Sequence, residues 1–303
     1  MSMLLKSGQG PVPPARIAVL IATKGRPQGL NQLLRLLEDQ TVAPSIVVVS
    51  ATERADIEPI STKQPVEYIY GSAGLCRQRN RALERVRDDS DIVIFFDDDF
   101  APSATWLEHC AGAFASDNGV VGVTGLLLCD GAQGAEIPWE DARQLIRAAP
   151  PANVTGSMFP VPDGLYGCNM AYRTAAIRQL RFDERLVLYG WMEDRDFSRL
   201  AEKIGRLAGV DTMTGVHLGV KAGRVSGRKY GYSQVVNAWY LYKKGVLSVR
   251  EACSNIFRAL LMNSAKALWP EKHIDRLGRL RGNLIGVGDL MLGRGHPERA
   301  AEL

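Results

Sequence analysis

Long apolar runs, paired cysteines and an export signal are all missing from this sequence. No stretch of about 18 consecutive apolar residues is present, so a membrane-spanning helix is not expected. Residues 1–15 are rich in Gly, Pro and Ser and lack the apolar core and cleavage site of a signal peptide. We therefore expect residues 1–15 to form a disordered tail, and we expect the protein to work in the cytoplasm.

The five cysteines are an odd number and include no CxxC pair. This pattern argues against a disulfide framework and a structural zinc site, and it favours reduced thiols buried as small hydrophobic side chains. Apolar residues make up 46% of the 303-residue chain, which is typical of a globular core rather than of a disordered chain or a coiled coil.

Positive charge is unevenly distributed along the chain. From Lys221 onward there are 15 Lys and Arg against 6 Asp and Glu, a net charge of +9, whereas residues 1–220 carry a net charge of −5. A basic C-terminal part on an acidic body suggests a partner with phosphates, such as an anionic membrane face, a lipid pyrophosphate or a nucleic acid. A solvated helix surface is the ordinary alternative. Nucleic acid is disfavoured because the aromatic residues do not interleave with the basic ones.

Buried strands alternate with helices over the first two thirds of the chain. The expected strands are 16–23, 45–50, 66–70, 91–96, 120–125, 167–173 and 206–210. The expected helices are one carrying Leu30, Leu33, Leu34 and Leu37 on one face, then 76–89, 104–115, 174–180 and 193–205. This alternation predicts an α/β fold with a doubly wound, mainly parallel sheet flanked by helices. Ligands of such sheets bind beyond the carboxyl ends of the strands.

Two stretches are predicted to be loops. Residues 130–164 are rich in Ala, Pro and Gly, and a loop this long is usually functional or mobile. Residues 214–234 are rich in Gly and basic residues, as a mobile loop that folds over a diphosphate would be. Arg224, Arg228 and Lys229 are candidate pyrophosphate contacts there, with a solvated loop as the alternative.

Residues 231–303 are predicted to form a basic helical extension. One apolar stripe consists of Val249, Cys253, Ile256, Leu260, Ala265 and Leu268, and a second consists of Ile274, Leu277, Leu280, Leu284 and Met291. These stripes are expected to pack on the sheet domain. Contact with a membrane surface is the alternative.

Three consecutive carboxylates follow the buried run 92–96. Asp97 and Asp99 are two residues apart, so both can turn toward one hard divalent cation such as Mn²⁺ or Mg²⁺, which prefers oxygen ligands and shares substrate phosphates. Without an ion, three neighbouring acids shift their pKa values or destabilise the site. A solvated acidic turn is the alternative. His217 is a candidate for the same metal shell, although a single histidine is more often structural.

A second acidic motif, Glu193-Asp194, follows aromatic residues at an expected helix start. Backbone N–H groups can hold a carboxylate there while its other side faces a pocket. Asp194 could then act as a general base that takes a proton from a sugar hydroxyl. Plain helix capping is the alternative.

The motifs "ATKGRPQGLNQLLRLL", "SAGLCRQRNRAL", "FFDDDF", "GCNMAYR" and "WMEDRDFSRL" occur in this order over residues 16–220. Together they resemble the inverting family 2 nucleotide-sugar glycosyltransferases of GT-A fold. The resemblance implies a catalytic domain over 16–230, with a nucleotide-sugar-binding half at 16–125 and an acceptor-binding half at 126–230.

The resemblance also implies roles for individual residues. The donor would contact Thr23, Arg26, Arg79, Asn80, Asp97 and Asp98, and the charge of the loop 214–234 adds Arg224 and Arg228 to these candidates. The metal would bind to Asp97, Asp99 and His217, Asp194 would be the catalytic base, and the acceptor would contact Tyr166, Trp191, Met192 and Glu193. Members commonly carry an acidic residue after the second strand to contact the base. Here Ser50 occupies that position, with Glu53 or Asp56 as displaced candidates.

We therefore expect a metal-dependent, inverting transferase that moves a sugar from a nucleotide donor, such as a UDP-sugar, to a glycan hydroxyl. The basic extension suggests a peripheral enzyme at the inner face of a bacterial membrane, acting on a lipid-linked oligosaccharide for polysaccharide synthesis. The alternatives are an NDP-sugar nucleotidyltransferase and a non-catalytic module that binds sugar nucleotides or nucleic acid.

Overall fold

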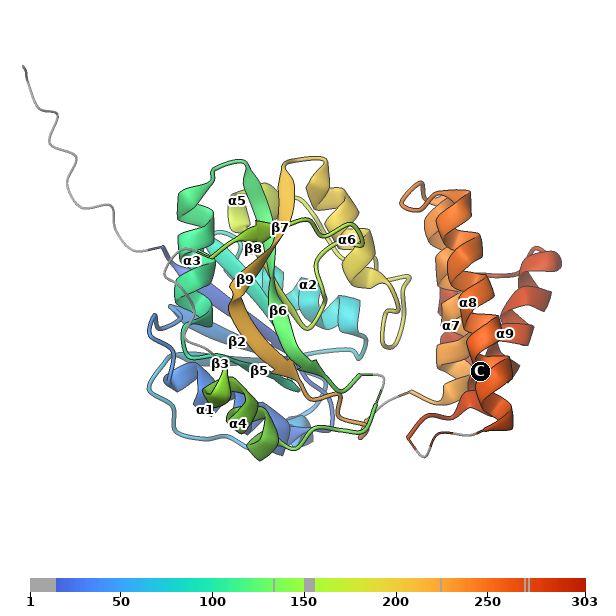
Figure 1. Cartoon of the computed structure of the whole chain (residues 1–303), viewed down its shortest axis with the longest axis horizontal. Helices are drawn as coiled ribbons and strands as arrows, with labels where there is room; N and C mark the ends of the chain where they lie inside the picture. The colour runs from blue at the N-terminus through green and yellow to red at the C-terminus, as the bar shows by residue number, and fades with distance from the viewer. Residues whose placement is uncertain (1–14, 133, 150–155, 224, 270, 272) are drawn as a thin grey trace, which may run out of the picture.

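The computed structural model describes residues 15–303 apart from 133, 150–155, 224, 270 and 272, so the expected tail lies almost wholly outside the described residues. Its centre is a nine-stranded sheet in the order β3-β2-β1-β4-β8-β6-β9-β5, with β7 paired to β9 (Figure 1). Four neighbouring strands run parallel: β3 (Val66–Tyr70), β2 (Ile46–Ala51), β1 (Ile17–Ala22) and β4 (Ile92–Asp97). They confirm the predicted α/β fold with a mainly parallel sheet.

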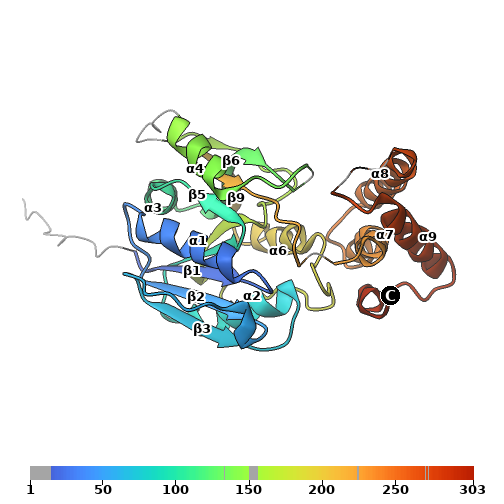
Figure 2. The same ribbon diagram turned by 90° about the horizontal axis from the view of Figure 1, so that it is seen from below.

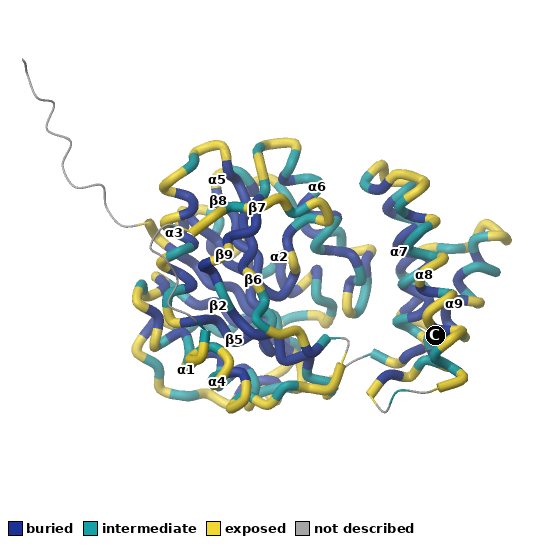
Figure 3. Tube along the Cα trace, in the orientation of Figure 1, coloured by how far each residue is buried: buried dark blue, intermediate teal, exposed yellow. Residues whose placement is uncertain are grey.

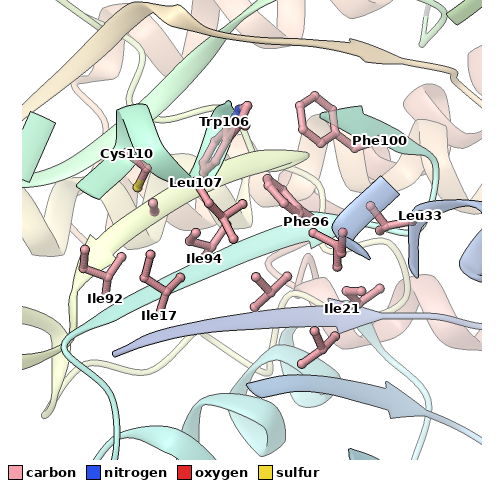
Figure 4. Close-up of a cluster of buried hydrophobic side chains, with 14 of the residues drawn as sticks. Ile17, Ile21, Leu33, Ile92, Ile94, Phe96, Phe100, Trp106, Leu107 and Cys110 are labelled. Carbon is pink, nitrogen blue, oxygen red and sulfur yellow. The ribbon is translucent and has the colours of Figure 1, made fainter. Parts of the chain in front are cut away.

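Alternate residues of β1 pack on opposite sides of the sheet, which explains why the strand is apolar throughout. Ile17, Val19 and Ile21 belong to the core on one side, and Ala18 and Leu20 to the core on the other. The first core also contains the leucine face of α1 (Pro27–Glu38) and residues of α3 (Trp106–Ser116). Figure 4 shows part of this cluster, with Trp106 and Phe96 in edge contact at 4.7 Å between ring centroids.

The second half of the sheet mixes strand directions. Its members are β5 (Phe100–Pro102), β6 (Val120–Asp130), β7 (Met158–Phe159), β8 (Asn169–Arg173) and β9 (Arg206–His217). β8 is antiparallel to β4 and β6, whereas β6 and β9 are parallel. The expected strand 206–210 was too short, because β9 continues through its pairing with β5 and β6 as far as His217.

The predicted loop 130–164 contains two regular elements, so that expectation was wrong in part. Residues Trp139–Ala148 form α4, and β7 pairs with β9. Ala142 of α4 is fully buried, and it packs with Val216 and Leu218 in a separate small core. The remaining helices of the sheet domain are α2 (Leu75–Val86), α5 (Thr174–Ile177) and α6 (Glu193–Glu202), with a short 3₁₀ turn, η1, at Arg54–Asp56.

The C-terminal part is helical and stands beside the sheet domain in both views (Figures 1 and 2). It consists of α7 (Gly227–Lys243), α8 (Val249–Leu268), α9 (Arg276–Met291) and the 3₁₀ turn η2 (Pro297–Glu302). The predicted loop 214–234 was therefore too long, because Thr214 belongs to β9 and Gly227 begins α7. Ala238 and Leu241 of α7 join the second core of the sheet domain.

Burial on α8 and α9 differs from the expected pattern (Figure 3). The buried residues of α8 are Ala252, Ala259 and Asn263, and those of α9 are Gly278, Gly282, Asn283, Gly286 and Asp289. Leu268 is 73% exposed and Met291 is 83% exposed, so much of both predicted stripes faces outward. Cys253 is exposed as well, as is Cys129, whereas the other three cysteines are buried.

Candidate active site

The three aspartates at the end of β4 have different sets of partners. Asp98 is buried and accepts hydrogen bonds from Thr23 Oγ1 at 2.7 Å and from Arg26 Nη1 at 2.8 Å. Arg26 Nε also donates to the carbonyl of Ala222 at 2.8 Å. Thr23 and Arg26, predicted to line the nucleotide pocket, therefore join the β1–α1 turn to Asp98 and to the segment that follows β9.

Asp97 and Asp99 come together with His217 of β9. One donor atom from each of the three residues lies within 4.8 Å of the others, a spacing that suits one metal ion. Two carboxylates and an imidazole are a suitable donor set for a divalent cation, so these residues fit a bound metal. Burial lowers the pKa of His217, but hydrogen bonds to Asp130 and Asp99 and the charges of Asp99 and Asp97 raise it to about 10.

Asp130, at the end of β6, is a site residue that the sequence analysis missed. Its Oδ1 lies 2.9 Å from His217 Nδ1, and its Oδ2 accepts a hydrogen bond from the Tyr166 hydroxyl at 2.9 Å. The Tyr166 ring also stands edge-on to the His217 ring, with 5.9 Å between centroids. Tyr166, predicted as an acceptor contact, thus supports Asp130. Like Asp97, Asp130 follows an apolar strand, so the same rule could have found it.

Arg79 of α2 joins the candidate metal site to α6. Its Nη2 donates to Asp97 Oδ1 and to the carbonyl of Gly167, both at 2.8 Å, and its Nη1 donates to Glu193 Oε1. The side chain is buried, so its charge is shared between two carboxylates in a low-dielectric setting. Contact of Arg79 with the nucleotide remains a prediction, whereas its contacts with these two acids are structural findings.

Glu193 and Asp194 begin α6 immediately after a strained turn. Leu188 and Met192 both have positive φ, at 61° and 71°, and Met192 forms the left-handed N-cap of the helix. Such conformations are costly for residues with side chains and persist where the surroundings impose them. Met192 and Glu193, predicted as acceptor contacts, are buried. Burial raises the pKa of Glu193 to about 8, although Arg79 acts in the opposite direction.

Asp194 is held by backbone donors on both of its oxygens. Gly167 N donates to Oδ2 at 3.0 Å, and Arg195 N donates to Oδ1 at 2.8 Å. A Cβ at Gly167 would lie 3.2 Å from Asp194 Oδ2, so a glycine permits this close approach. Burial raises the pKa of Asp194 above its ordinary value, while these N–H groups and Arg79 oppose the shift. A fixed, partly desolvated carboxylate of this kind can accept a proton.

The predicted acceptor residue Trp191 lies against α7. Its ring stands edge-on to Tyr230, with 5.2 Å between centroids, and its carbonyl accepts a hydrogen bond from Asn237 at 3.0 Å. Arg228 is exposed in the first turn of α7, and its diphosphate contact remains a prediction. Arg224 lies outside the described residues.

The candidates for contact with the base have structural partners of their own. Ser50 is fully buried and accepts a hydrogen bond from Arg81 Nε at 3.1 Å. Asp56 is buried and accepts hydrogen bonds from Gly25 N at 2.7 Å and from Thr52 N at 2.8 Å. It therefore connects the loop after β1 to the loop after β2. Glu53, the third candidate, is exposed.

Asn80 holds the segment after α5 in place. Its amide donates to the Phe182 carbonyl and accepts from Phe182 N, so Asn80 and this segment are fixed to each other. It also lines an open pocket of about 680 Å³ beside α2, which is separate from the aspartate triplet. The pocket is lined by Ser72, Arg77, Asn80, Arg81, Glu84, Arg181, Phe182 and Glu184.

Comparison with known families decides the classification. The family described as glycosyl transferase family 2 matches residues 18–181, more than half of the chain. The chain belongs to glycosyl transferase family 2. This confirms the resemblance found from the sequence motifs, and the matched range includes the aspartate triplet and Arg79. No curated protein sequence matches the chain.

Solved structures agree with this family 2 assignment and show the GT-A fold. Residues 1–349 of S. aureus TarS in complex with UDP-GlcNAc match with a TM-score of 0.53 and 16% identity, over 95% of this chain and 83% of that one. The mannosyltransferase PcManGT from Pyrobaculum calidifontis, in complex with GDP-Man and Mn²⁺, matches with a TM-score of 0.51 and 16% identity, over 92% and 87%. The chain spans 44% of the longer chain in another crystal structure of S. aureus TarS. The chain is thus a member of glycosyl transferase family 2 with the GT-A fold.

Proposed function

We propose that this family 2 glycosyltransferase is an inverting, metal-dependent enzyme. The observation that carries the proposal is one continuous set of contacts between two acidic groups. Asp97, of the group with Asp99 and His217, is bonded through Arg79 to Glu193, and Glu193 precedes Asp194. The buried guanidinium of Arg79 therefore fixes the candidate cation site relative to the candidate base.

In the proposed reaction Asp194 accepts the proton of an acceptor hydroxyl as that oxygen attacks the anomeric carbon of the donor sugar. The backbone N–H groups of Gly167 and Arg195 hold the carboxylate, so little reorganisation is needed when the proton moves. The hydroxyl forms the new C–O bond as the bond to the nucleoside diphosphate breaks on the opposite face. A single displacement of this kind inverts the anomeric configuration and requires no covalent nucleophile.

Asp97, Asp99 and His217 are proposed to hold the divalent cation, Mn²⁺ or Mg²⁺. When bound, such an ion neutralises the diphosphate and stabilises the departing nucleoside diphosphate. A UDP-sugar is the proposed donor, with Thr23, Arg26, Ser50, Glu53, Arg79, Asn80, Asp98 and Arg228 as the described candidates for donor contacts. Support for the class of donor comes from TarS, which was solved with UDP-GlcNAc, and from PcManGT, which was solved with GDP-Man.

The proposed acceptor is a hydroxyl of a lipid-linked glycan at the inner face of a bacterial membrane, in polysaccharide synthesis. Trp191 lies three residues before Asp194, and Tyr166 directly precedes Gly167, whose N–H binds Asp194. Aromatic faces of this kind suit sugar rings. The net charge of +9 from Lys221 onward supports work close to lipid phosphates.

The experiment that tests this function needs no knowledge of the acceptor. UDP, GDP, CDP and dTDP are each added to the protein with Mn²⁺ or with EDTA, and the melting temperature is measured. A ligand that binds the folded state raises it by an amount that grows with affinity. We expect one diphosphate, UDP, to stabilise the protein only when metal is present. Stabilisation by none of the four would contradict the proposal.

Product analysis then separates the transferase from its rivals. With the matching nucleotide-sugar and a mixed glycan acceptor, a transferase releases nucleoside diphosphate. A nucleotidyltransferase would release pyrophosphate from a nucleoside triphosphate and a sugar phosphate, and a non-catalytic module would bind its nucleotide without releasing either product.

A further inference from the structure

The helix pair α8–α9 buries small and polar residues and exposes large apolar ones. Glycines of α9 lie against the backbone of α7, where a Cβ at Gly282 would be 2.0 Å from the carbonyl oxygen of Arg228. Asn263 of α8 and Asn283 of α9 are buried and hydrogen bond to each other at 2.8 Å. This contact leaves the leucine-rich sides of both helices outside the bundle, whereas a helix that only serves a globular core turns such a side inward.

The exposed apolar side chains form a stripe on each helix. On α8 they are Phe257, Leu261, Met262 and Leu268, with Trp269 directly after the helix; on α9 they are Leu277, Leu284 and Met291, with Leu292 directly after it. Spacings of four and seven residues keep the main positions of each stripe on one side of its helix. A contiguous exposed patch of this kind marks an interaction site.

Both stripes face the same side of the helix pair. α9 returns alongside α8 after a short connection, and Asn263 bonds to both Asn283 and Arg276. Successive residues of an α-helix are rotated by about 100° around the helix axis. By this measure the main stripe positions lie roughly a third of a turn from Asn263 on α8 and from Asn283 on α9. The rotation has the same sense on both helices. When two helices are antiparallel and in contact, surfaces that are rotated equally from the contact face the same direction. Together they form one surface, here called the α8–α9 face.

Three arginines belong to this face. Arg250 and Arg258 of α8 and Arg281 of α9 are exposed, and none has an ion-pair or hydrogen-bond partner within the described part of the chain. Arg250 is seven residues before Phe257, and Arg281 lies between Leu277 and Leu284 on the same stripe. Five of the six acids from Lys221 onward, all except Glu302, have partners elsewhere. Their partners are Arg195 for Glu251, Lys266 and Arg276 for Glu271, the helix N-terminus for Asp275, Arg294 and Arg299 for Asp289, and Arg185 for Glu298.

We propose that the α8–α9 face lies on the surface of an anionic lipid bilayer. Apolar side chains of a surface helix enter the boundary between headgroups and acyl chains, and the cations beside them bind lipid phosphates. No helix within the described residues is long and apolar enough to cross a bilayer, so the contact is with one face. A second copy of the chain fits less well, because pairing two such faces would bring six unpaired arginines together.

The position of the face also suits the transferase site. α7 contacts Trp191 of the site through Tyr230 and Asn237, and α8 contacts the sheet domain through Glu251, which pairs with Arg195 of α6. A bilayer under α8 and α9 would therefore lie close to the acceptor side. The inference does not depend on the proposed acceptor, because binding to lipid requires neither donor nor acceptor.

Vesicle binding tests the proposal directly. The full chain is sedimented with vesicles of phosphatidylcholine alone, or of equal parts phosphatidylcholine and phosphatidylglycerol, without nucleotide. We expect binding to the anionic vesicles that weakens as salt is added, and little binding to the neutral ones. Replacing Arg250, Arg258 and Arg281 together with Gln should lower the affinity roughly 100-fold, since each basic residue near an anionic surface contributes about fivefold.

Matched control variants distinguish binding through this face from nonspecific binding to vesicles. The double variant F257S/L284S should also lose binding, whereas Ile204→Ser and Arg147→Gln, which change exposed residues of the sheet domain, should bind like the unchanged chain. Equal binding of all four proteins would overturn the proposal. So would binding that does not depend on the lipid charge.

A labelling experiment keeps the arginines and the large apolar side chains of the face unchanged. Cys253 lies on α8 and Cys129 on β6, and both are exposed. A polarity-sensitive dye is attached at Cys253 in Cys129→Ser, or at Cys129 in Cys253→Ser. We expect anionic vesicles to shift the emission of the dye at Cys253 to the blue and to leave the dye at Cys129 unchanged. Identical responses, or a shift at Cys253 that needs only a high protein concentration and accompanies dimers in ultracentrifugation, would overturn the proposal.

Discussion

The Nδ1 atom of His217 lies 2.9 Å from Oδ1 of Asp130, which turns the Nε2 atom of His217 toward Asp99 Oδ1 at 3.6 Å. A carboxylate that accepts a hydrogen bond from one ring nitrogen fixes the ring orientation and raises the basicity of the other nitrogen. Asp130 is thus placed to support His217 in its proposed role as a metal ligand.

Removing this support should weaken metal binding. We expect Asp130→Ala to raise the dissociation constant for Mn²⁺ about 10- to 100-fold, and Asp130→Asn to fall between this variant and the unchanged chain. Isothermal titration of the protein with Mn²⁺ alone measures the effect without turnover. Asp141→Asn, at an exposed acid of α4, should bind Mn²⁺ normally. Normal affinity in Asp130→Ala would show that the contact does not serve the metal.

The two acidic motifs should fail in different ways. Asp194→Asn removes the proposed base but no proposed donor contact, so we expect kcat to fall about 10²- to 10⁴-fold with nearly normal binding of the nucleotide. Asp99→Asn removes a carboxylate of the cation group and should weaken metal-dependent nucleotide binding itself. Steady-state kinetics and nucleotide titrations with Mn²⁺ separate the two effects. Equal losses of nucleotide binding would contradict this division of roles.

The base should also give the activity a characteristic pH dependence. Asp194 must be unprotonated to act, and burial raises its pKa above the ordinary value for an aspartate. As the pH falls, activity should therefore decline through a pKa higher than that of a solvent-exposed aspartate. The measurement is kcat against pH at saturating donor and metal, with circular dichroism at each pH to exclude unfolding. A decline only at the pH expected for an ordinary aspartate would argue against Asp194 as the base.

The sheet and the aspartate triplet follow from local patterns in the sequence. Strands such as 17–22 are apolar throughout because both sides are buried, and Asp97 follows such a strand at its carboxyl end. The Arg79–Glu193 contact joins residues 114 positions apart, so no local pattern could predict it. Helix α4 was missed because its buried contact rests on a small residue, Ala142, within a segment rich in Ala, Pro and Gly.

The apolar stripes of α8 and α9 show a different limit of prediction. Periodicity identifies which side of a helix is apolar, but it does not say what covers that side. Here the close contact between helices is made by Gly282 and its neighbours, which carry no hydrophobic signal. Leu277 and Leu284 therefore point outward, although they satisfy every criterion for a buried face.

Lys244 forms the main ionic contact between α7 and the sheet domain, which leads to a prediction about stability. Its Nζ lies 2.7 Å from Asp183 Oδ2 and 2.7 Å from Asp196 Oδ2, and the Asp196 side chain is fully buried. Lys244→Met would leave a buried carboxylate without its cation, which should lower the free energy of unfolding by about 3 kcal/mol. Urea denaturation at neutral pH measures this change. Lys243→Met, at the exposed neighbouring position, is the control and should cost little.

The loss in Lys244→Met should shrink as the pH falls. Burial already raises the pKa of Asp196, and Lys244 opposes this shift, so the pKa rises further when the lysine is removed. The folded variant then binds a proton at Asp196 more readily than the unfolded chain does, and folding gains stability as the pH drops toward that raised pKa. The difference in unfolding free energy between the variant and the unchanged chain should therefore be smaller in mild acid than at neutral pH. A difference that stays constant or grows would mean that the lost stability comes from packing rather than from an unpaired Asp196.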